Sequence, residues 1–491
     1  MGPTLRPQAA PTRKPRRGDR LELAVERIDP RGTAHGHLRD SSGEYDVRLP
    51  RGVPGSRLVA QVTRRRGARI DTRVLELLEA GPETVPVRCA HAATCGGCRF
   101  QDWSYAAQLE HKRQVVEETL RAGGVLDSAR VEPCLGCDPP WAYRNKMDFT
   151  FSARRWIEPA EPVGAPRGFA LGLHPSGHWR SVIDVHACAI APPGTDAIVA
   201  SARRLALEQG LEPWDVATHR GLLRHLVVRR NARGEVLVAV VTSEEASERI
   251  RPYVRALLAE RPEIATAVQL VSSSLAQVAT GERELVLHGP GWILEELDGL
   301  TFRLSAGSFF QTNTAQAERL VRAVREAAAC GPEDVVVDLS CGVGTFALSL
   351  ARGAREVWGF ELAPSAVTDA RLNAQRNAIG NAHFLAGDVA ATLRERDLPR
   401  PAVCVVDPPR AGLHKSVLAA LAALAPDRVV YVSCNVSAAA QDLRALSAAG
   451  LRLVRVQPID LFPHTPHVEC VLVLERSGEV RARAAEPERE R

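Results

Sequence analysis

The sequence lacks long apolar segments. It has no run of about 18 apolar residues, the length that a membrane-spanning helix needs. No apolar stretch follows the basic start of the chain either, so we expect no secretory signal peptide. These absences predict a cytoplasmic protein with no membrane partner, whose eleven cysteines are reduced. Cysteine chemistry should then be metal binding or nucleophilic attack rather than disulfide formation.

Acidic residues are scarce at the start of the chain, where Asp19 is the single acid among the first twenty residues. The basic residues there are Arg6, Arg13, Lys14, Arg16, Arg17 and Arg20. A second basic run follows, with Arg57, Arg64, Arg65, Arg66, Arg69 and Arg73. Such runs suit a phosphate backbone, although a solvated tail and a solvated strand face have the same composition. The charge distribution therefore favours a nucleic-acid partner, while the net charge is only +5.

The pattern of residues divides the chain into five parts. Residues 1–16 form a basic segment without periodicity, and residues 477–491 a charged tail, so both are expected to be disordered. Residues 17–80 show short alternating runs between turn clusters, which predicts a small OB-like β-barrel. Residues 85–300 mix strands and helices, which predicts an α+β domain. Residues 301–476 alternate strand and helix, which is typical of an α/β, doubly wound, Rossmann-like fold.

The expected α/β domain has polar residues at successive strand ends. The turn DLSCGVGTF carries Gly342 and Gly344 between a strand and a helix, where a ligand can approach the backbone closely. The next strand ends at Glu361, which suits two ribose hydroxyls, and a third is followed by Asp388, which suits an adenine amino group. The third glycine of a dinucleotide-binding turn is missing, and Phe346 stands two residues after Gly344. S-adenosylmethionine is therefore favoured over NAD.

The fourth and fifth strand ends indicate a reaction site. The stiff turn DPPR places Asp407 and Arg410 after one strand, and Cys434 closes the next strand, VVYVSC. A lone cysteine is more often a small buried apolar residue than a nucleophile. The motifs around Cys434 must therefore decide between these two roles. Glu469 lies farther along in the apolar run HVECVLVL, where it could be a base or the partner of an arginine. Methylation of uracil at carbon 5 requires a pair of groups. A thiolate adds to carbon 6, and a carboxylate removes the proton at carbon 5.

A cysteine-rich motif precedes the α+β region. In CAHAATCGGC, Cys89, Cys95 and Cys98 have a spacing that permits either zinc or an iron–sulfur cluster. A second pair, Cys134 and Cys137, forms a CxxC that we interpret as structural.

In these motifs the chain resembles the RNA (uracil-5-)-methyltransferase family. SFFQTN, DLSCGVGTF, GFEL, GD, DPPRAGL, YVSCN and HVEC occur in the family's order and spacing. The resemblance implies a nucleophile at Cys434 and a base at Glu469. It also implies that S-adenosyl-L-methionine is bound by Gln311, Ser340, Thr345, Glu361, Asp388 and Asp407.

The same resemblance assigns roles to the N-terminal half. The barrel is similar to a TRAM domain, an RNA-binding module, and CAHAATCGGC is similar to the iron–sulfur cysteines of the 23S ribosomal-RNA members. It implies a [4Fe-4S] cluster on Cys89, Cys95, Cys98 and Cys188, and a monomer that acts on rRNA rather than tRNA. Ser340 stands where the family usually has an aromatic residue, and Thr345 where it often has Asn.

Two other functions fit parts of the sequence. An RNA-binding iron–sulfur protein could carry a vestigial methyltransferase fold, although it would have no need of Cys434 and Glu469 together. A methyltransferase of exocyclic amino groups would need no thiolate. Loss of activity when Cys434 is replaced would exclude it.

Overall fold

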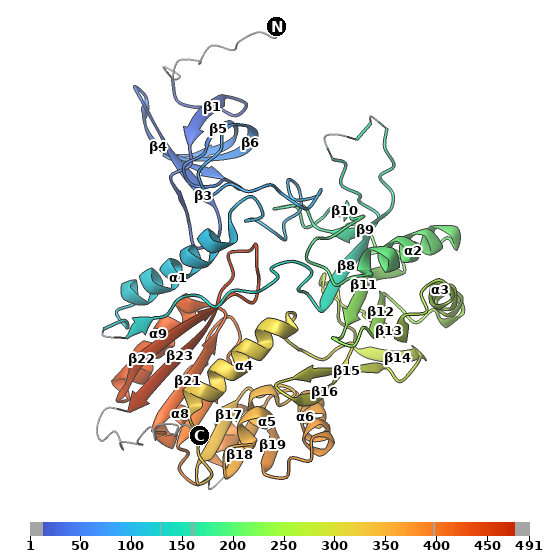
Figure 1. Ribbon diagram of the computed structural model, residues 1–491. Helices are drawn as coiled ribbons and strands as arrows, with labels where there is room; N and C mark the ends of the chain where they lie inside the picture. The colour runs from blue at the N-terminus through green and yellow to red at the C-terminus, as the bar shows by residue number, and fades with distance from the viewer. Residues whose placement is uncertain (1–12, 128, 159–160, 163, 396–397, 477–491) are drawn as a thin grey trace, which may run out of the picture.

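The computed structural model describes residues 13–476, except residues 128, 159–160, 163 and 396–397 (Figure 1). Most of the expected basic tail (1–16) and all of the expected charged tail (477–491) lie outside the described residues. Within the described part, no helix combines the length and apolar character needed to cross a membrane.

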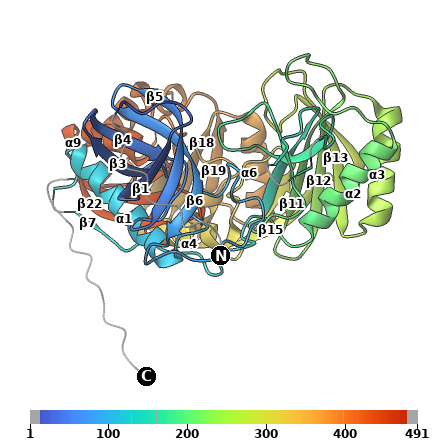
Figure 2. The ribbon, with the colours of Figure 1, turned by 90° about the horizontal axis from the view of Figure 1, so that it is seen from above.

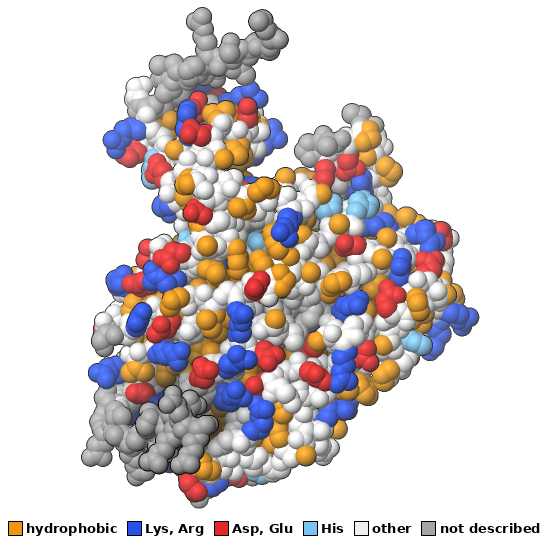
Figure 3. All heavy atoms as spheres, in the orientation of Figure 1, with side chains coloured by type: hydrophobic (Ala, Val, Ile, Leu, Met, Phe, Trp, Pro, Cys, Tyr) orange, Lys and Arg blue, Asp and Glu red, His pale blue; other side chains and the backbone are white. Residues whose placement is uncertain are grey.

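Short alternating strands near the N-terminus form a six-stranded sheet in the order β1-β5-β6-β4-β3-β2. Its strands are β1 (Arg20–Ala24), β2 (Arg27–Ile28), β3 (Ala34–Asp40), β4 (Gly43–Leu49), β5 (Arg57–Arg66) and β6 (Arg69–Glu79). Gly36 lets β3 approach β1, because a Cβ there would stand 2.3 Å from the carbonyl oxygen of Ala24. The sheet curls around an apolar core that includes Leu23, Val47 and Ile70. It protrudes from the rest of the molecule, with Lys and Arg side chains on both of its flanks in Figure 3.

The middle of the chain builds a seven-stranded sheet in the order β10-β9-β8-β11-β12-β13-β14. Its strands are β8 (Lys146–Ser152), β9 (Ala170–Leu173), β10 (Ile183–Asp184), β11 (Leu223–Arg230), β12 (Val236–Thr242), β13 (Ile264–Val271) and β14 (Arg283–His288). One face packs on α2 (Thr195–Glu208) and α3 (Ser247–Glu260). The other face shares a continuous core with the C-terminal half through the hairpin β15 (Trp292–Leu297) and β16 (Leu300–Ser305). The two halves are therefore packed as one body.

The C-terminal half contains an eight-stranded sheet in the order β19-β18-β17-β20-β21-β23-β22-β7. Its strands are β7 (Arg130–Val131), β17 (Val335–Leu339), β18 (Glu356–Glu361), β19 (Ala382–Ala386), β20 (Val403–Val406), β21 (Arg428–Ser433), β22 (Leu451–Ile459) and β23 (Glu469–Arg476). The first five strands of that order are parallel. After β17 the next strands, β18 and β19, are added on one side of it, whereas β20 and β21 are added on the other side. The neighbours β17 and β20 therefore form the topological switch point, where α/β sheets bind ligands.

Helices cover both faces of this sheet, which explains its almost continuously apolar strands. Alternate residues of β17 show the division, since Val336 packs on one face and Val337 on the other. The helices of this half, and the N-terminal helix that joins it, are α1 (Tyr105–Ala122), α4 (Thr314–Ala328), α5 (Thr345–Ala351), α6 (Pro364–Arg376), α7 (Val389–Arg394), α8 (Lys415–Leu424) and α9 (Val436–Ala448). Viewed from above, α1 lies beneath the N-terminal sheet and beside α9 (Figure 2).

The expected Rossmann-like alternation is present, with two differences. The sheet is mixed, because β23 runs antiparallel to both β21 and β22. Strand β22 was not predicted from the sequence, because Arg452, Arg455 and Pro458 interrupt its apolar pattern. Strand β7, which comes from the N-terminal half, completes the edge beside β22.

A single buried amide joins the hairpin to the turn after β17. Asn373 of α6 is fully buried, accepts a hydrogen bond from the Arg303 N–H (2.9 Å) and donates one to the Val343 carbonyl (3.1 Å). Replacement Asn373→Ala leaves both backbone groups without this partner, so we expect the free energy of unfolding to fall by about 1–3 kcal/mol. Urea unfolding should show this loss, with the exposed Thr368→Ala as the control. Equal stabilities would contradict it.

Candidate active site

The turn between β17 and α5 is held in a left-handed conformation. Gly342 and Gly344 have φ values of 55° and 89°, and Ser340 also has a positive φ of 67°. A Cβ at Gly344 would press on Phe384 at 3.2 Å, so glycine is required there for space as well as for conformation. The Gly342 N–H donates to the Glu361 carboxylate (3.1 Å). The acid after β18 therefore shapes the backbone against which a ligand would lie.

Most of the residues expected to bind the cofactor follow four neighbouring parallel strands. Ser340 and Thr345 follow β17, Glu361 ends β18, Asp388 follows β19, and Asp407 follows β20. Because parallel strands place their carboxyl ends at one edge, the fold brings these five residues to the same edge of the sheet.

Two of the residues expected to bind the cofactor already make hydrogen bonds within the protein. Asp388 is the N-cap of α7, and its Oδ1 accepts a hydrogen bond from the Ala391 N–H (2.9 Å). Gln311 does not belong to the strand ends and precedes α4, where its backbone carbonyl accepts from the Asn145 amide (2.8 Å). The expected contacts of Asp388 with adenine and of Gln311 with the methionine end of the cofactor stay predictions.

A buried acid, Asp338, stands at the same edge and was missed by the sequence analysis. It is fully buried on β17, and among the described residues neither carboxylate oxygen has a hydrogen-bond partner. Burial, reinforced by the charge of Asp407, raises the pKa of Asp338 to about 8. Burial also raises the pKa of Asp407 to about 7. The only sequence signal for Asp338 was its place in the run VVVDL, where a carboxylate interrupts a buried strand.

Cys434 and Glu469 come together because β23 is antiparallel to β21. Ser433 pairs with Cys470 in the ladder, so the next step along each strand sets Cys434 opposite Glu469. Glu469 is 4% exposed, and burial followed by the charge of Asp407 raises its pKa well above the usual range. Burial also raises the pKa of the half-buried Cys434, and the Glu469 carboxylate adds to that shift. The expected nucleophile and base are thus adjacent at one strand end.

Arg410 is the cation beside this pair. Its charge and a side-chain hydrogen bond oppose part of the rise in the pKa of Cys434, and its charge opposes part of the rise in the pKa of Glu469. Its backbone carbonyl accepts from the side-chain amide of Asn435 (2.8 Å), which ties the turn after β20 to the residue after the nucleophile. From the sequence, Arg410 was expected to stand in the stiff turn DPPR, and no role was predicted for it. The arrangement can stabilise a thiolate at Cys434.

The four expected cluster cysteines line a single cavity in the N-terminal half. Cys89, Cys95, Cys98 and Cys188 surround it together with apolar side chains that include Leu173 and Ile190. Burial, with smaller contributions from the other cysteines, raises the pKa of Cys95 to about 11. Among the described residues, no group of three or more histidine, cysteine or acidic side chains is arranged to hold a metal ion.

The second cysteine pair does not surround this cavity, although Cys137 packs in the same small cluster as Cys98 and Cys188. Cys137 donates to the Pro139 carbonyl (3.3 Å), and its sulfur accepts from the side-chain amide of Asn313 (3.5 Å). Cys134 packs beside the core of the eight-stranded sheet. Neither residue lines the four-cysteine cavity.

Sequence comparison finds relatives over nearly the whole chain. A sequence profile described as tRNA (uracil-5-)-methyltransferase matches residues 233–477. An uncharacterized RNA methyltransferase of Chlorobaculum tepidum is 36% identical over 472 residues, which are 94% of this chain and 97% of the relative. An uncharacterized RNA methyltransferase of Halalkalibacterium halodurans is 34% identical, with coverages of 95% and 99%.

Structural comparison gives a neighbour over a similar span. The crystal structure of a Pyrococcus abyssi tRNA (uracil-54, C5)-methyltransferase in complex with S-adenosyl-L-homocysteine matches with a TM-score of 0.72 and 26% identity. The match covers 92% of this chain and 100% of the other chain.

The raised pKa of Asp338 predicts a pH dependence of stability. An acid with a higher pKa in the folded than in the unfolded state holds its proton more tightly when folded, so stability is lost as pH rises from about 4 toward 8. We expect the unfolding temperature of the wild type to fall between pH 5 and pH 8 by more than that of Asp338→Asn. Differential scanning calorimetry would measure both, with the surface variant Asp427→Asn as the control. Parallel falls in all three proteins would refute the assignment.

Proposed function

Since the chain belongs to the RNA (uracil-5-)-methyltransferase family, whose members are S-adenosylmethionine-dependent enzymes, we propose that it methylates carbon 5 of a specific uridine through a covalent Cys434 adduct. The observation that carries this proposal is the pairing of β21 with β23, which sets Cys434 opposite the buried Glu469. A methyltransferase of amino groups would have no use for that pair.

Each residue of the pair has one step in the proposed reaction. The Cys434 thiolate, stabilised by Arg410, forms a bond to carbon 6 of the uracil, and the electrons of the carbon 5–carbon 6 double bond move into an enolate. S-adenosylmethionine supplies the methyl group, which carbon 5 accepts as the bond from that methyl to sulfur breaks. Glu469 then removes the proton at carbon 5, the double bond re-forms, and the bond to Cys434 breaks. A raised pKa suits Glu469 to this task because it makes the carboxylate a stronger base.

The cofactor would lie along the carboxyl ends of β17 to β20. Ser340, Thr345, Glu361, Asp388 and Asp407 are proposed to contact it there, and Gln311 to hold its methionine end. The left-handed turn supports this proposal, because Gly342 and Gly344 leave its backbone open to close approach.

A [4Fe-4S] cluster is proposed on Cys89, Cys95, Cys98 and Cys188. Four thiolates around one cavity fit the ligand set of such a cluster, in which each cysteine binds a different iron. The spacing of the cysteines would also permit zinc in place of the cluster. When bound, the cluster would cross-link segments distant in sequence.

The RNA is proposed to be 23S ribosomal RNA, bound as a substrate by a monomer. The six-stranded sheet is proposed to act as a TRAM-like module, and the exposed Arg64, Arg65, Arg66 and Arg69 around the β5–β6 turn would contact phosphates. The proposed divisions of the chain remain 17–80, 85–300 and 301–476, as expected from the sequence. The Pyrococcus abyssi neighbour, which acts on tRNA, supports tRNA as the alternative.

Two variants should separate the two chemical steps. We expect Cys434→Ala to lose methyl transfer and to form no adduct, because the nucleophile is gone. Glu469→Gln should form the adduct but release it at least about a hundredfold more slowly, since general-base catalysis contributes factors of that size. A denaturing gel of protein mixed with labelled RNA would show the adduct, and Cys330→Ala, at the opposite edge of the sheet, should behave as wild type. Full activity of Cys434→Ala would refute the mechanism.

The choice of RNA can be tested directly. We expect the wild type to transfer labelled methyl groups to 23S rRNA from a strain that lacks the gene, and not to tRNA from that strain. Mapping of 5-methyluridine in both RNAs would locate the modified position. Transfer to tRNA alone would overturn the rRNA proposal and leave the chemistry intact. Transfer to neither, at high cofactor concentration, would favour an RNA-binding protein with a vestigial fold.

A further inference from the structure

One loop connects the cysteine site to the proposed catalytic base. Residues 460–467, here called the strap, join β22 to β23 and end two residues before Glu469. The strap is buried over most of its length, although loops usually run over the surface. Most of its contacts are made by residues more than 300 positions away in the sequence.

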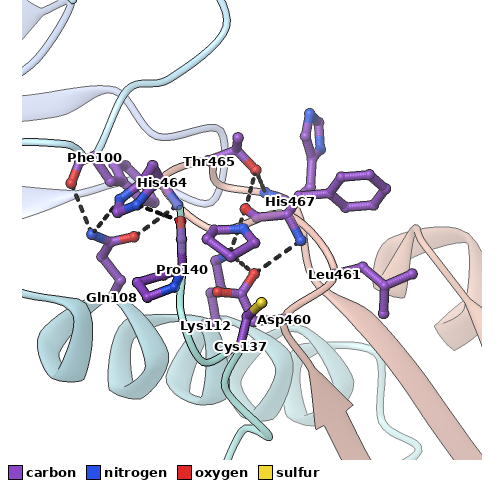
Figure 4. Close-up of polar contacts among 12 residues, drawn as sticks. Phe100, Gln108, Lys112, Cys137, Pro140, Asp460, Leu461, His464, Thr465 and His467 are labelled. Atoms are coloured by element: carbon purple, nitrogen blue, oxygen red, sulfur yellow. Dashed lines mark hydrogen bonds and ion pairs between the residues drawn. The ribbon is translucent and has the colours of Figure 1, made fainter. Parts of the chain in front are cut away.

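The start of the strap is fixed by a fully buried ion pair. Lys112 Nζ lies 2.5 Å from Asp460 Oδ1, and the two side chains are 1% and 0% exposed. The second carboxylate oxygen accepts from the Tyr105 hydroxyl (2.8 Å), and Lys112 also donates to the Phe462 carbonyl (3.2 Å). Burying two charges is costly unless both are paired and hydrogen-bonded, and these contacts bond both ends of the pair. Figure 4 shows the contact between Lys112 and Asp460. A small displacement of the strap would therefore unpair a buried charge.

The centre of the strap is held in a strained conformation. His464 has a φ of 65°, which a residue other than glycine keeps only when its surroundings impose it. Its N–H donates to Gln108 Oε1 (3.0 Å), and its Nε2 lies 2.9 Å from the Pro140 carbonyl (Figure 4). Its ring stacks on Trp141, with the ring centroids 3.8 Å apart. These contacts from two segments fix the path of the chain toward Glu469.

The same residue contacts the cysteine motif. The backbone N–H groups of Arg99 and Phe100, which directly follow Cys98, both donate to the His464 carbonyl (2.9 and 3.0 Å). The Tyr143 hydroxyl, which packs in the same small cluster as Cys98, donates to the Pro463 carbonyl (3.2 Å). Two backbone hydrogen bonds thus connect the strap to the two residues that follow Cys98.

We propose that the strap couples the four-cysteine site to the base, with Lys112, Asp460 and His464 as positioning residues for Glu469. This inference rests on the proposed function. The group that fills the cysteine cavity holds Cys98, Cys98 holds the strap, and the strap sets where the Glu469 carboxylate stands. Cys434 directly follows β21 and lies outside the strap, so the coupling acts on removal of the carbon 5 proton and leaves the attack on carbon 6 unchanged. Displacement of a reacting group by about 1 Å can cost a hundredfold in rate.

Strap variants test the positioning role. In single-turnover reactions with RNA, Asp460→Asn and the milder His464→Asn, which tolerates a positive φ, should form the adduct at the wild-type rate. Both should release it about tenfold more slowly or worse. Glu475→Gln, which breaks an ion pair at the other end of β23, should leave both rates unchanged. If formation and release slow together, or if release is normal in both strap variants, the proposal is wrong. Failure of Glu469→Gln to trap an adduct would instead refute the proposed base.

The cysteine site supplies a second test that needs no activity measurement. We expect Cys98→Ser to lose bound iron and to speed amide hydrogen exchange in peptides covering residues 99–100 and 460–467. Peptides from α8, which packs on the core of the eight-stranded sheet away from the four cysteines, should exchange as in the wild type. Loss of iron with unchanged exchange in the strap would overturn the coupling. Unchanged iron content would show that Cys98 does not hold the proposed cluster.

Discussion

The antiparallel pairing of β23 with β21 is the constraint on which the proposed chemistry depends. In a wholly parallel sheet the residue that begins one strand lies at the opposite edge from the residue that ends its neighbour. Reversal of β23 brings the start of that strand, Glu469, to the edge where β21 ends and where the other parallel strands deliver their polar residues. A base can therefore be buried in the sheet and still stand beside the nucleophile. The loop that reverses the chain then becomes part of the site.

The sequence was sufficient to predict the general architecture because buried parallel strands have a local signature. The apolar composition of runs such as VVVDL and RVVYVS predicts buried strands. The residues that follow these runs were expected at the edge of the sheet where a ligand binds. The direction of a strand has no such signature, so the reversal of β23 was not predicted. Strand β22 was missed because arginines and a proline interrupt its apolar pattern. Its place beside β23 comes from tertiary pairing.

The limits of prediction at the site have a similar cause. The proposed nucleophile and base could be named because they stand in recognisable runs. The roles of Arg410, Asp338 and the Lys112–Asp460 pair could not be predicted, since their importance arises from neighbours that folding brings to them. Lys112 lies in a helix whose sequence looks amphipathic, and only the structure places its ammonium group against an acid 348 positions away. Buried charge is conspicuous in a structure and inconspicuous in a sequence.

The position of β23 also bears on how the protein is made. Ribosomes synthesise β21 and β22 first, yet the finished sheet has β23 between them. Until β23 has been synthesised, β21 and β22 must each leave one edge unpaired, because the place between them, the slot, is empty. Open edges of apolar strands are templates for association with other chains. The arrangement that buries the base thus makes the nascent chain a candidate for chaperone binding, and the slot closes only when the strand that carries Glu469 enters it.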